Sequence, residues 1–174
     1  MQITHPLNVL KFCPKCGSSD FHQSGDKSLK CDQCSFHFFF NSAAAVAALV
    51  TDDEGKLLLT TRAIEPDSGK LDLPGGFVDP GETAENAVKR ELEEELSMKV
   101  KSLEYIGSAP NEYIFSGYSV FTLDMAFRVI PESLTGLVAM DDILEYRFYA
   151  KNEIDYTQIP APSIKSFVEQ YFSS

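Results

Sequence analysis

Short blocks of apolar residues separated by polar turns run through most of the chain, and they predict strands more often than helices. Residues 37–53 (HFFFNSAAAVAALVTDD) resemble one apolar strand that ends at the polar turn 52–55. Residues 56–62 (KLLLTTR) follow as its expected hairpin partner. Three later segments also have strand composition: 100–109, 119–130 and 145–150.

Two segments have helical periodicity instead. From Thr83 to about Leu96, apolar residues recur at intervals of three and four positions: Ala84, Ala87, Val88, Leu92 and Leu96. Residues 163–172 (SIKSFVEQYF) predict a closing helix, and residues 71–82, rich in Gly and Pro, predict a loop with a short strand. Strands mixed with two helices indicate an α/β fold in which a sheet packs between helices.

Composition narrows the class of protein. A chain of 174 residues with 44% hydrophobic and 24% charged residues suits one ordinary domain plus a small module. The net charge of -11 speaks against an electrostatically driven nucleic-acid binder. No apolar run reaches membrane-spanning length, and the amino terminus has no signal-peptide pattern, so we expect a cytoplasmic protein without membrane partners.

All four cysteines lie in two CxxC pairs near the amino terminus: Cys13, Cys16, Cys31 and Cys34. Each pair can aim two sulfurs at one point, which predicts a closed Zn²⁺ site in a small zinc ribbon, residues 1–38, with a structural role. Two disulfides or a redox CxxC are the alternatives, and His22 and His37 are alternative ligands. The remaining residues, 39–174, form the predicted main domain.

Six glutamates fall within residues 76–98, and three of them share one side of the predicted helix. At about 100° per residue, Glu91, Glu94 and Glu95 project within about a third of its circumference. Like charges so close repel each other unless a cation lies among them, and oxygen ligands favour Mg²⁺ or Mn²⁺. A solvated acidic face is the alternative interpretation.

The spacing of this segment resembles the signature box of the Nudix hydrolases: Gly76, five residues, Glu82, seven residues, Arg90-Glu91, an apolar residue, any residue, Glu94-Glu95. The resemblance implies an α/β/α sandwich with a mixed sheet, preceded here by the four-Cys ribbon. It also implies hydrolysis of a diphosphate linked to a nucleoside, with divalent cations as cofactors. One position departs, because Ser97 stands where the family has a glycine.

The resemblance also implies a role for each matched position. Glu91 and Glu95 are the expected principal Mg²⁺ ligands, Glu94 is a further ligand or the base that deprotonates water, and the carbonyl of Gly76 completes the shell. Glu94 and Glu95 are thus expected catalytic residues. Glu82 and Arg90 are expected to pair and to hold the loop on the helix.

A zinc ribbon directly before the box resembles the NADH pyrophosphatase branch of the family, whose substrate-selective motif is SQPWPFPxS. Residues 108–116 read SAPNEYIFS, which retains both end serines, Pro110 and an aromatic residue at Tyr113. Tyr113 and Ser116 are therefore the expected substrate-binding residues, whereas the tryptophan is lost to Asn111. Asp142 aligns with a catalytic glutamate of that branch, and the branch implies a possible homodimer.

Together these patterns predict a Mg²⁺-dependent hydrolase of small nucleotide diphosphates such as NADH, NAD, ADP-ribose or nucleotide sugars. The alternative is a module that senses a nucleotide without hydrolysing it, with the ribbon contacting a protein or nucleic acid.

Overall fold

The computed structural model describes residues 2–173 of the chain, which divide into two compact units. The first consists of Met1–Ser42 together with Glu112–Phe121, and the second of Ala43–Asn111 together with Thr122–Ser174. The first unit thus extends four residues beyond the predicted ribbon and also includes a later segment. None of the described helices is both long and apolar enough to cross a lipid bilayer.

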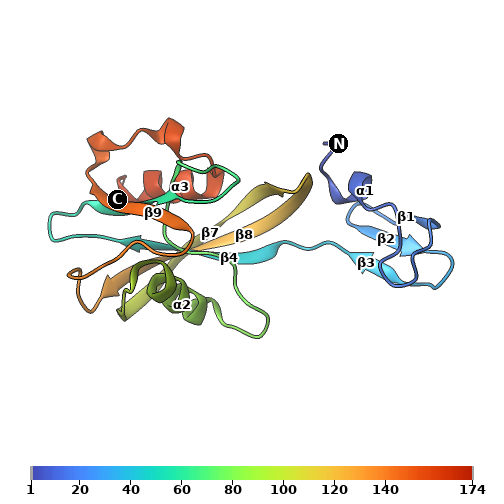
Figure 1. Ribbon diagram of the computed structural model, residues 1–174, viewed down its shortest axis with the longest axis horizontal. Coiled ribbons are helices and arrows are strands. Elements are labelled where there is room, and N and C mark those ends of the chain that lie inside the picture. The colour runs from blue at the N-terminus through green and yellow to red at the C-terminus, as the bar shows by residue number, and fades with distance from the viewer. Residues whose placement is uncertain (1, 174) are drawn as a thin grey trace. The chain divides into compact units, whose positions relative to one another are not determined.

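The first unit is a small three-stranded antiparallel sheet with a short helix, α1 (Pro6–Val9) (Figure 1). Its strands, in the order β1-β2-β3, are β1 (Phe21–Gln23), β2 (Ser28–Cys31) and β3 (His37–Phe39). One face of this sheet contributes to a core of only five buried residues: Leu7, Cys13, Phe21, Leu29 and Cys31. A core of this size is too small to stabilise a fold without a further link such as a bound metal.

The later segment joins the first unit through contacts with its amino-terminal residues. The backbone N–H of Ser119 donates to the carbonyl of Thr4 at 2.8 Å, and the two side-chain hydroxyls are 2.7 Å apart. The rings of His5 and Phe121 pack with centroids 5.5 Å apart.

The second unit contains two three-stranded sheets, except for the ends of β7 and β8 within residues 112–121, which belong to the first unit (Figure 1). One has the order β4-β8-β7, made of β4 (Ala43–Val50), β8 (Tyr118–Pro131) and β7 (Val100–Phe115), with β4 parallel to β8. The other has the order β6-β5-β9, made of β6 (Leu71–Asp72), β5 (Leu57–Arg62) and β9 (Ile143–Tyr149), and is antiparallel. β7 runs beyond its predicted end at residue 109, and Pro110 is tolerated because β7 is an edge strand.

The predicted continuous strand 37–53 and its hairpin with residues 56–62 are wrong. The chain breaks after Phe39, so β3 and β4 lie in different sheets, and β4 meets β5 only at the isolated bridge Thr51–Leu57. The free edge of β4 is occupied by residues 74–78: the N–H of Val46 donates to Gly76 O and that of Ala48 to Pro74 O, both at 2.8 Å. The Gly-rich loop takes the place that a hairpin partner would fill.

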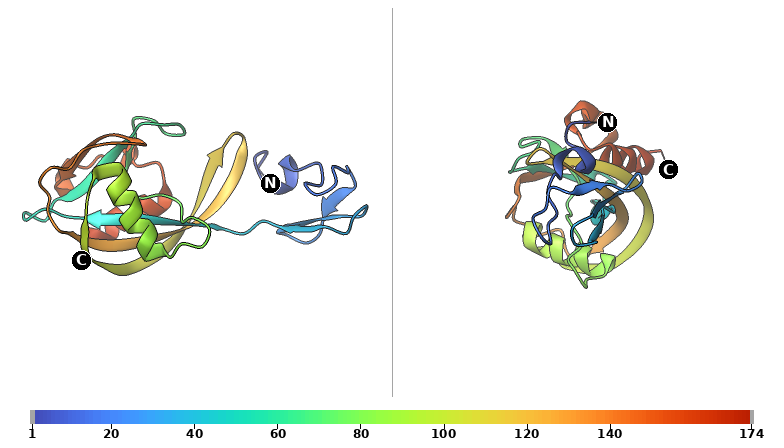
Figure 2. Two further views of the ribbon diagram at one scale, coloured as in Figure 1. Left: turned by 60° about the horizontal axis from the view of Figure 1, so that its bottom comes forward. Right: turned by 90° about the vertical axis from the view of Figure 1, so that its right-hand side faces the viewer.

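Helices cover the sheets on both sides, as the sequence predicts. Val46, Ala48 and Val50 of β4 pack in the core under α2 (Ala84–Leu96), and Ala47 and Leu49 pack in the core under α3 (Pro162–Tyr171). Such a strand, buried on both faces, reads as a continuous apolar run. In Figure 1, α3 lies above the strands and α2 below them, and the left panel of Figure 2 brings α2 to the front. Two short 3₁₀ helices, η1 (Lys151–Glu153) and η2 (Tyr156–Gln158), connect β9 to α3.

Candidate functional site

Helix α2 presents the box glutamates, and both of its ends follow from the sequence. It begins after Thr83, whose side chain accepts a hydrogen bond from the first-turn backbone. It ends at Ser97, which adopts the left-handed conformation at φ 52°. The next residue, Met98, is buried and donates its backbone N–H to Leu92 O at 3.0 Å. The conformation expected of the family's glycine is therefore present with serine in its place, at a conformational cost.

Arg90 lies among three of the glutamates. Its Nε and Nη2 donate to the two carboxylate oxygens of Glu82 at 3.1 and 3.0 Å, and Nη2 also donates to the carbonyl of Phe77. Its Nη1 donates to Glu91 at 2.9 Å and to Glu94 at 3.0 Å. The hydrogen bonds that Arg90 donates to Glu82 lower the pKa of Glu82. Arg90 thus ties the loop to the helix and holds two further carboxylates beside each other.

Glu95 is the most buried of the box glutamates. Its side chain is 6% exposed and accepts a hydrogen bond from the backbone N–H of Gly75 at 3.0 Å. Burial raises the pKa of Glu95 to about 8, and the negative charges of Glu91, Asp72 and Asp142 add to the rise. Burial also raises the pKa of Glu91, against the lowering effect of Arg90. Burial and the neighbouring negative charges therefore disfavour the ionised form of Glu95.

The two adjacent glycines of the loop bring its backbone close to these carboxylates. A Cβ on Gly75 would lie 2.1 Å from the carbonyl oxygen of Val46, so no other residue fits there. A Cβ on Gly76 would lie 2.4 Å from Oε1 of Glu91. Glu91 and Glu95 therefore face the same two-residue stretch of loop, although they leave the helix one turn apart.

These residues fit a divalent cation in chemistry. Glu91 and Glu95 have raised pKa values and lie beside the glycine pair 75–76. A Mg²⁺ or Mn²⁺ ion bound to their carboxylate oxygens would stabilise the charged form of both side chains. The carbonyl of Gly76 already accepts from Val46, and its second lone pair remains available. Glu94 is half exposed and pairs with Arg90, so its carboxylate can reach solvent.

Asp142 lies in the turn before β9, where its carbonyl accepts from Ala63. It is exposed, yet its charge raises the pKa of Glu95, which places it in the same electrostatic environment as the box. Asp141 acts in the same way on Glu91.

Sequence reasoning did not single out Asp141 or Asp72 as residues near the box. Asp72 is paired with Arg62 at 2.8 Å, and burial raises its pKa. The signal in the sequence was weak: Asp72 precedes the glycine loop by two residues, and Asp141 adjoins Asp142.

Tyr113 and Ser116, the expected substrate-binding residues, belong to the other compact unit. The ring of Tyr113 stacks on that of Phe115, with centroids 6.3 Å apart and planes 9° apart. Ser116 occupies the hairpin turn between β7 and β8 at φ 51°. Their role in substrate binding stays a prediction.

The four cysteines converge as the spacing predicts. Their four sulfurs all lie within 4.8 Å of one another. Among residues 2–173 no other group of three or more His, Cys, Asp or Glu residues, the box glutamates included, comes together in this way. The Cys13–Cys34 and Cys16–Cys31 sulfurs are 3.7 Å apart, well beyond a disulfide bond. Sulfurs held tetrahedrally at about 2.3 Å from one Zn²⁺ ion would be about 3.8 Å apart, so the spacing fits zinc.

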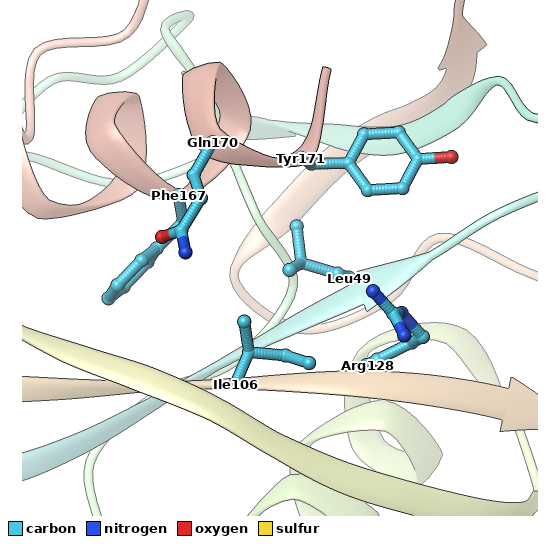
Figure 3. A pocket seen from close by; sticks show the side chains of 6 residues that line it. All are labelled: Leu49, Ile106, Arg128, Phe167, Gln170 and Tyr171. Carbon is cyan, nitrogen blue, oxygen red and sulfur yellow. The ribbon is translucent and has the colours of Figure 1, made fainter. Parts of the chain in front are cut away.

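A separate small pocket lies between α3 and the β4-β8-β7 sheet (Figure 3), with Phe167, Gln170 and Tyr171 on one side. Its volume of ≈ 30 Å³ holds only one or two water molecules. A nucleotide does not fit there.

Comparison with known proteins shows the family of the domain that carries this site. A family model described as NUDIX domain matches residues 41–169. The chain is 32% identical over 113 residues to the "NAD-capped RNA hydrolase NudC" of Haemophilus influenzae (strain PittGG), covering 63% of this chain and 42% of that protein. It is 35% identical over 98 residues to the protein of the same name from Pseudomonas aeruginosa (strain LESB58), covering 56% and 34%. The chain thus spans less than half the length of these relatives.

Solved structures show the same fold. A NUDIX hydrolase from Nitrosomonas europaea superposes with a TM-score of 0.68 at 26% identity, covering 94% of this chain and 91% of that one. The NUDIX domain of Shewanella oneidensis NrtR, crystallised with ADP ribose, superposes with a TM-score of 0.59 at 19% identity, covering 78% and 89%. The second likeness concerns the fold alone.

Proposed function

The chain belongs to the Nudix family, and from that membership we propose that it hydrolyses the diphosphate bond of a nucleoside-diphosphate-linked substrate with the help of Mg²⁺ or Mn²⁺. The observation that supports this most strongly is the convergence of Glu91 and Glu95 on the glycine pair 75–76. A solvated acidic face would not bury Glu95 to 6% exposure beside other acids.

In this proposal each residue has a role that follows from its position in the site. Glu91 and Glu95 hold the cation together with the carbonyl of Gly76, and Arg90 keeps Glu91 and Glu94 oriented. Glu94, which is half exposed, takes a proton from the attacking water at its carboxylate. The cation, when bound, neutralises diphosphate oxygens and lowers the pKa of a bound water. Asp142 acts beside Glu95 as a further acidic group near the substrate.

The substrate we propose is a dinucleotide or a related compound such as NADH, NAD, ADP-ribose or a nucleotide sugar. The relatives are named as hydrolases of NAD-capped RNA, whose cap contains the same diphosphate bond as NAD. We propose that this chain cleaves the same kind of diphosphate bond. The ribbon holds one structural Zn²⁺ through its four cysteines, and a small ribbon domain precedes the hydrolase domain at about residue 38.

The test is product analysis on a panel of NADH, ADP-ribose, diadenosine polyphosphates and nucleotide sugars, each with and without Mg²⁺. We expect Mg²⁺-dependent release of AMP from at least one of them. Glu95→Gln should abolish it, whereas Glu93→Gln, on the exposed side of the same helix, is the matched control and should not. Binding of a nucleotide without turnover of any compound would favour a sensing module instead.

A further inference from the structure

The ribbon sheet has a second face, which the zinc site and the core do not use. The strand register places His22 opposite Lys30 and Lys30 opposite His37, so these three side chains form one row across β1, β2 and β3. Phe39 lies in the next row on the same face, opposite Ser28. We call these four residues, His22, Lys30, His37 and Phe39, the ribbon face.

All four side chains of the ribbon face are exposed, and the ring of Phe39 is 50% exposed. The opposite face carries Phe21, Leu29 and Cys31, which are buried in the core. The sulfur of Cys31, the proposed zinc ligand in β2, therefore projects from the core face of the sheet. The ribbon face carries none of the four cysteines.

Two of the rings on the ribbon face are held in place before any partner binds. His37 and Phe39 pack with centroids 4.2 Å apart and an angle of 35° between their planes. Nε2 of His37 is 3.0 Å from the hydroxyl of Ser28, and that hydroxyl donates to Ser24 O, so His37 is the donor to Ser28. Ser28 is buried beneath this contact. An ordered pair of exposed rings loses little entropy when it stacks on a flat ligand.

The charge of this region differs from that of the whole chain. Residues 1–42 contain four lysines and three aspartates, for a formal charge of +1, and residues 43–174 carry the remaining charge of -12. None of the acidic residues lies within β1, β2 or β3, where Lys30 is the one charged residue. Asp20 directly precedes β1 and Asp32 directly follows β2, and the N–H of Asp32 donates to Asp20 O at 2.9 Å. The negative net charge that opposes nucleic-acid binding therefore lies in residues 43–174 and not in residues 1–42, which contain this sheet.

Exposed aromatic rings on a small sheet, beside a lysine and with no acidic residue within the strands, have the chemistry that recognises single-stranded nucleic acid. Bases stack on aromatic side chains while basic groups contact the phosphates. We propose that the ribbon face binds single-stranded RNA, with a base on Phe39 and His37 and a phosphate at Lys30. This inference goes beyond the proposed hydrolysis, and the choice of RNA over other single strands rests on the relatives' names, which say that they act on NAD-capped RNA.

The proposal is tested on the full, zinc-loaded chain by fluorescence anisotropy with an uncapped, labelled RNA of about 12 nucleotides at roughly 50 mM salt. Uncapped RNA lacks the bond that the catalytic site cleaves. We expect saturable binding that Phe39→Leu weakens by about fivefold or more, since leucine keeps an apolar side chain but has no aromatic face. Lys30→Gln should weaken binding and make its dependence on log salt shallower by about 0.7.

The matched control is Phe12→Leu, which changes another exposed phenylalanine of the same unit outside the ribbon face. Its affinity for RNA should equal that of the unmodified chain, and all three variants should retain zinc. Absence of saturable binding, or equal affinities for Phe39→Leu and Phe12→Leu, would overturn the proposal. So would self-association that Phe39→Leu abolishes while RNA binding persists.

The same variants separate this inference from the proposed hydrolysis. NADH or ADP-ribose hydrolysis should be unchanged in Phe39→Leu and Lys30→Gln. If the ribbon face is a separate site, these variants should lose RNA binding and keep hydrolysis. If the unmodified chain does not hydrolyse any substrate, the catalytic proposal is refuted, but the RNA-binding measurement still tests the ribbon face.

Discussion

Replacing Glu95 by glutamine should change the pH dependence of stability in the absence of Mg²⁺. The folded state holds the pKa of Glu95 at about 8, against 4.5 for an ordinary glutamate, so between these values the folded chain binds more protons than the unfolded chain. The free energy of unfolding therefore falls as pH rises from about 5 to 8. Glutamine stays neutral, so Glu95→Gln removes this loss.

The size of the effect follows from the interval between the two pKa values. Each pKa unit is worth about 1.4 kcal/mol, so the interval sets a ceiling of about 5 kcal/mol at pH 8. Water entering beside the ionised carboxylate relieves part of this cost, and we expect Glu95→Gln to be more stable than the unmodified chain by about 2 kcal/mol at pH 8. At pH 5 the two should differ little, because Glu95 is then mostly protonated.

The assay is thermal unfolding followed by circular dichroism in Mg²⁺-free buffer without a chelator, so that zinc stays bound. A gain of about 2 kcal/mol corresponds to a Tm roughly 4–8 °C higher for a domain of this size. Glu93→Gln is the control and should show no pH-dependent difference. Added Mg²⁺ should raise the Tm of the unmodified chain and not that of Glu95→Gln. A difference between the two proteins that is equal at pH 5 and pH 8 would refute the assigned environment of Glu95.

Three further changes test other parts of the structure. Ser97→Gly should raise the free energy of unfolding by about 1 kcal/mol in urea unfolding, because Ser97 is left-handed at φ 52°, whereas Ser97→Ala should give no gain. Arg90→Lys keeps the positive charge but removes the guanidinium group that donates to both Glu82 and Glu91. Turnover in a steady-state assay should therefore fall roughly 10- to 100-fold. An unchanged rate would exclude Arg90 as a positioning residue. Cys31→Ser should reduce zinc, measured by atomic emission, from about one ion per chain to well below that, and full retention would contradict the four-sulfur site.

Local patterns predicted the local parts of this structure. The helix from Thr83 to Leu96 and the convergence of Cys13 with its three partners follow from spacing alone, and both are present. The resemblance placed Ser97 at the position of a family glycine, and the helix does end there in the left-handed conformation, which glycine adopts most easily.

Non-local pairing could not be predicted in the same way. The turn 52–55 forms as expected, but the edge of β4 is taken by the loop 74–78, more than 20 residues later, and no local signal distinguishes that loop from a hairpin partner. For the same reason Asp72 and Asp141 were not connected with the box, because only the fold brings their charges near Glu95 and Glu91. Residues that are close in space but distant in sequence share no periodic pattern from which their contact could be predicted.

The central claim is that the carboxylates of α2 hold a divalent cation that enables diphosphate hydrolysis. The most direct measurement is the rate of AMP release from NADH or ADP-ribose as Mg²⁺ is titrated, compared among the unmodified chain, Glu95→Gln and Glu93→Gln. We expect saturable Mg²⁺-dependent release by the unmodified chain and by Glu93→Gln, and a rate lower by at least about 100-fold for Glu95→Gln. Equal rates for Glu95→Gln and Glu93→Gln would contradict it.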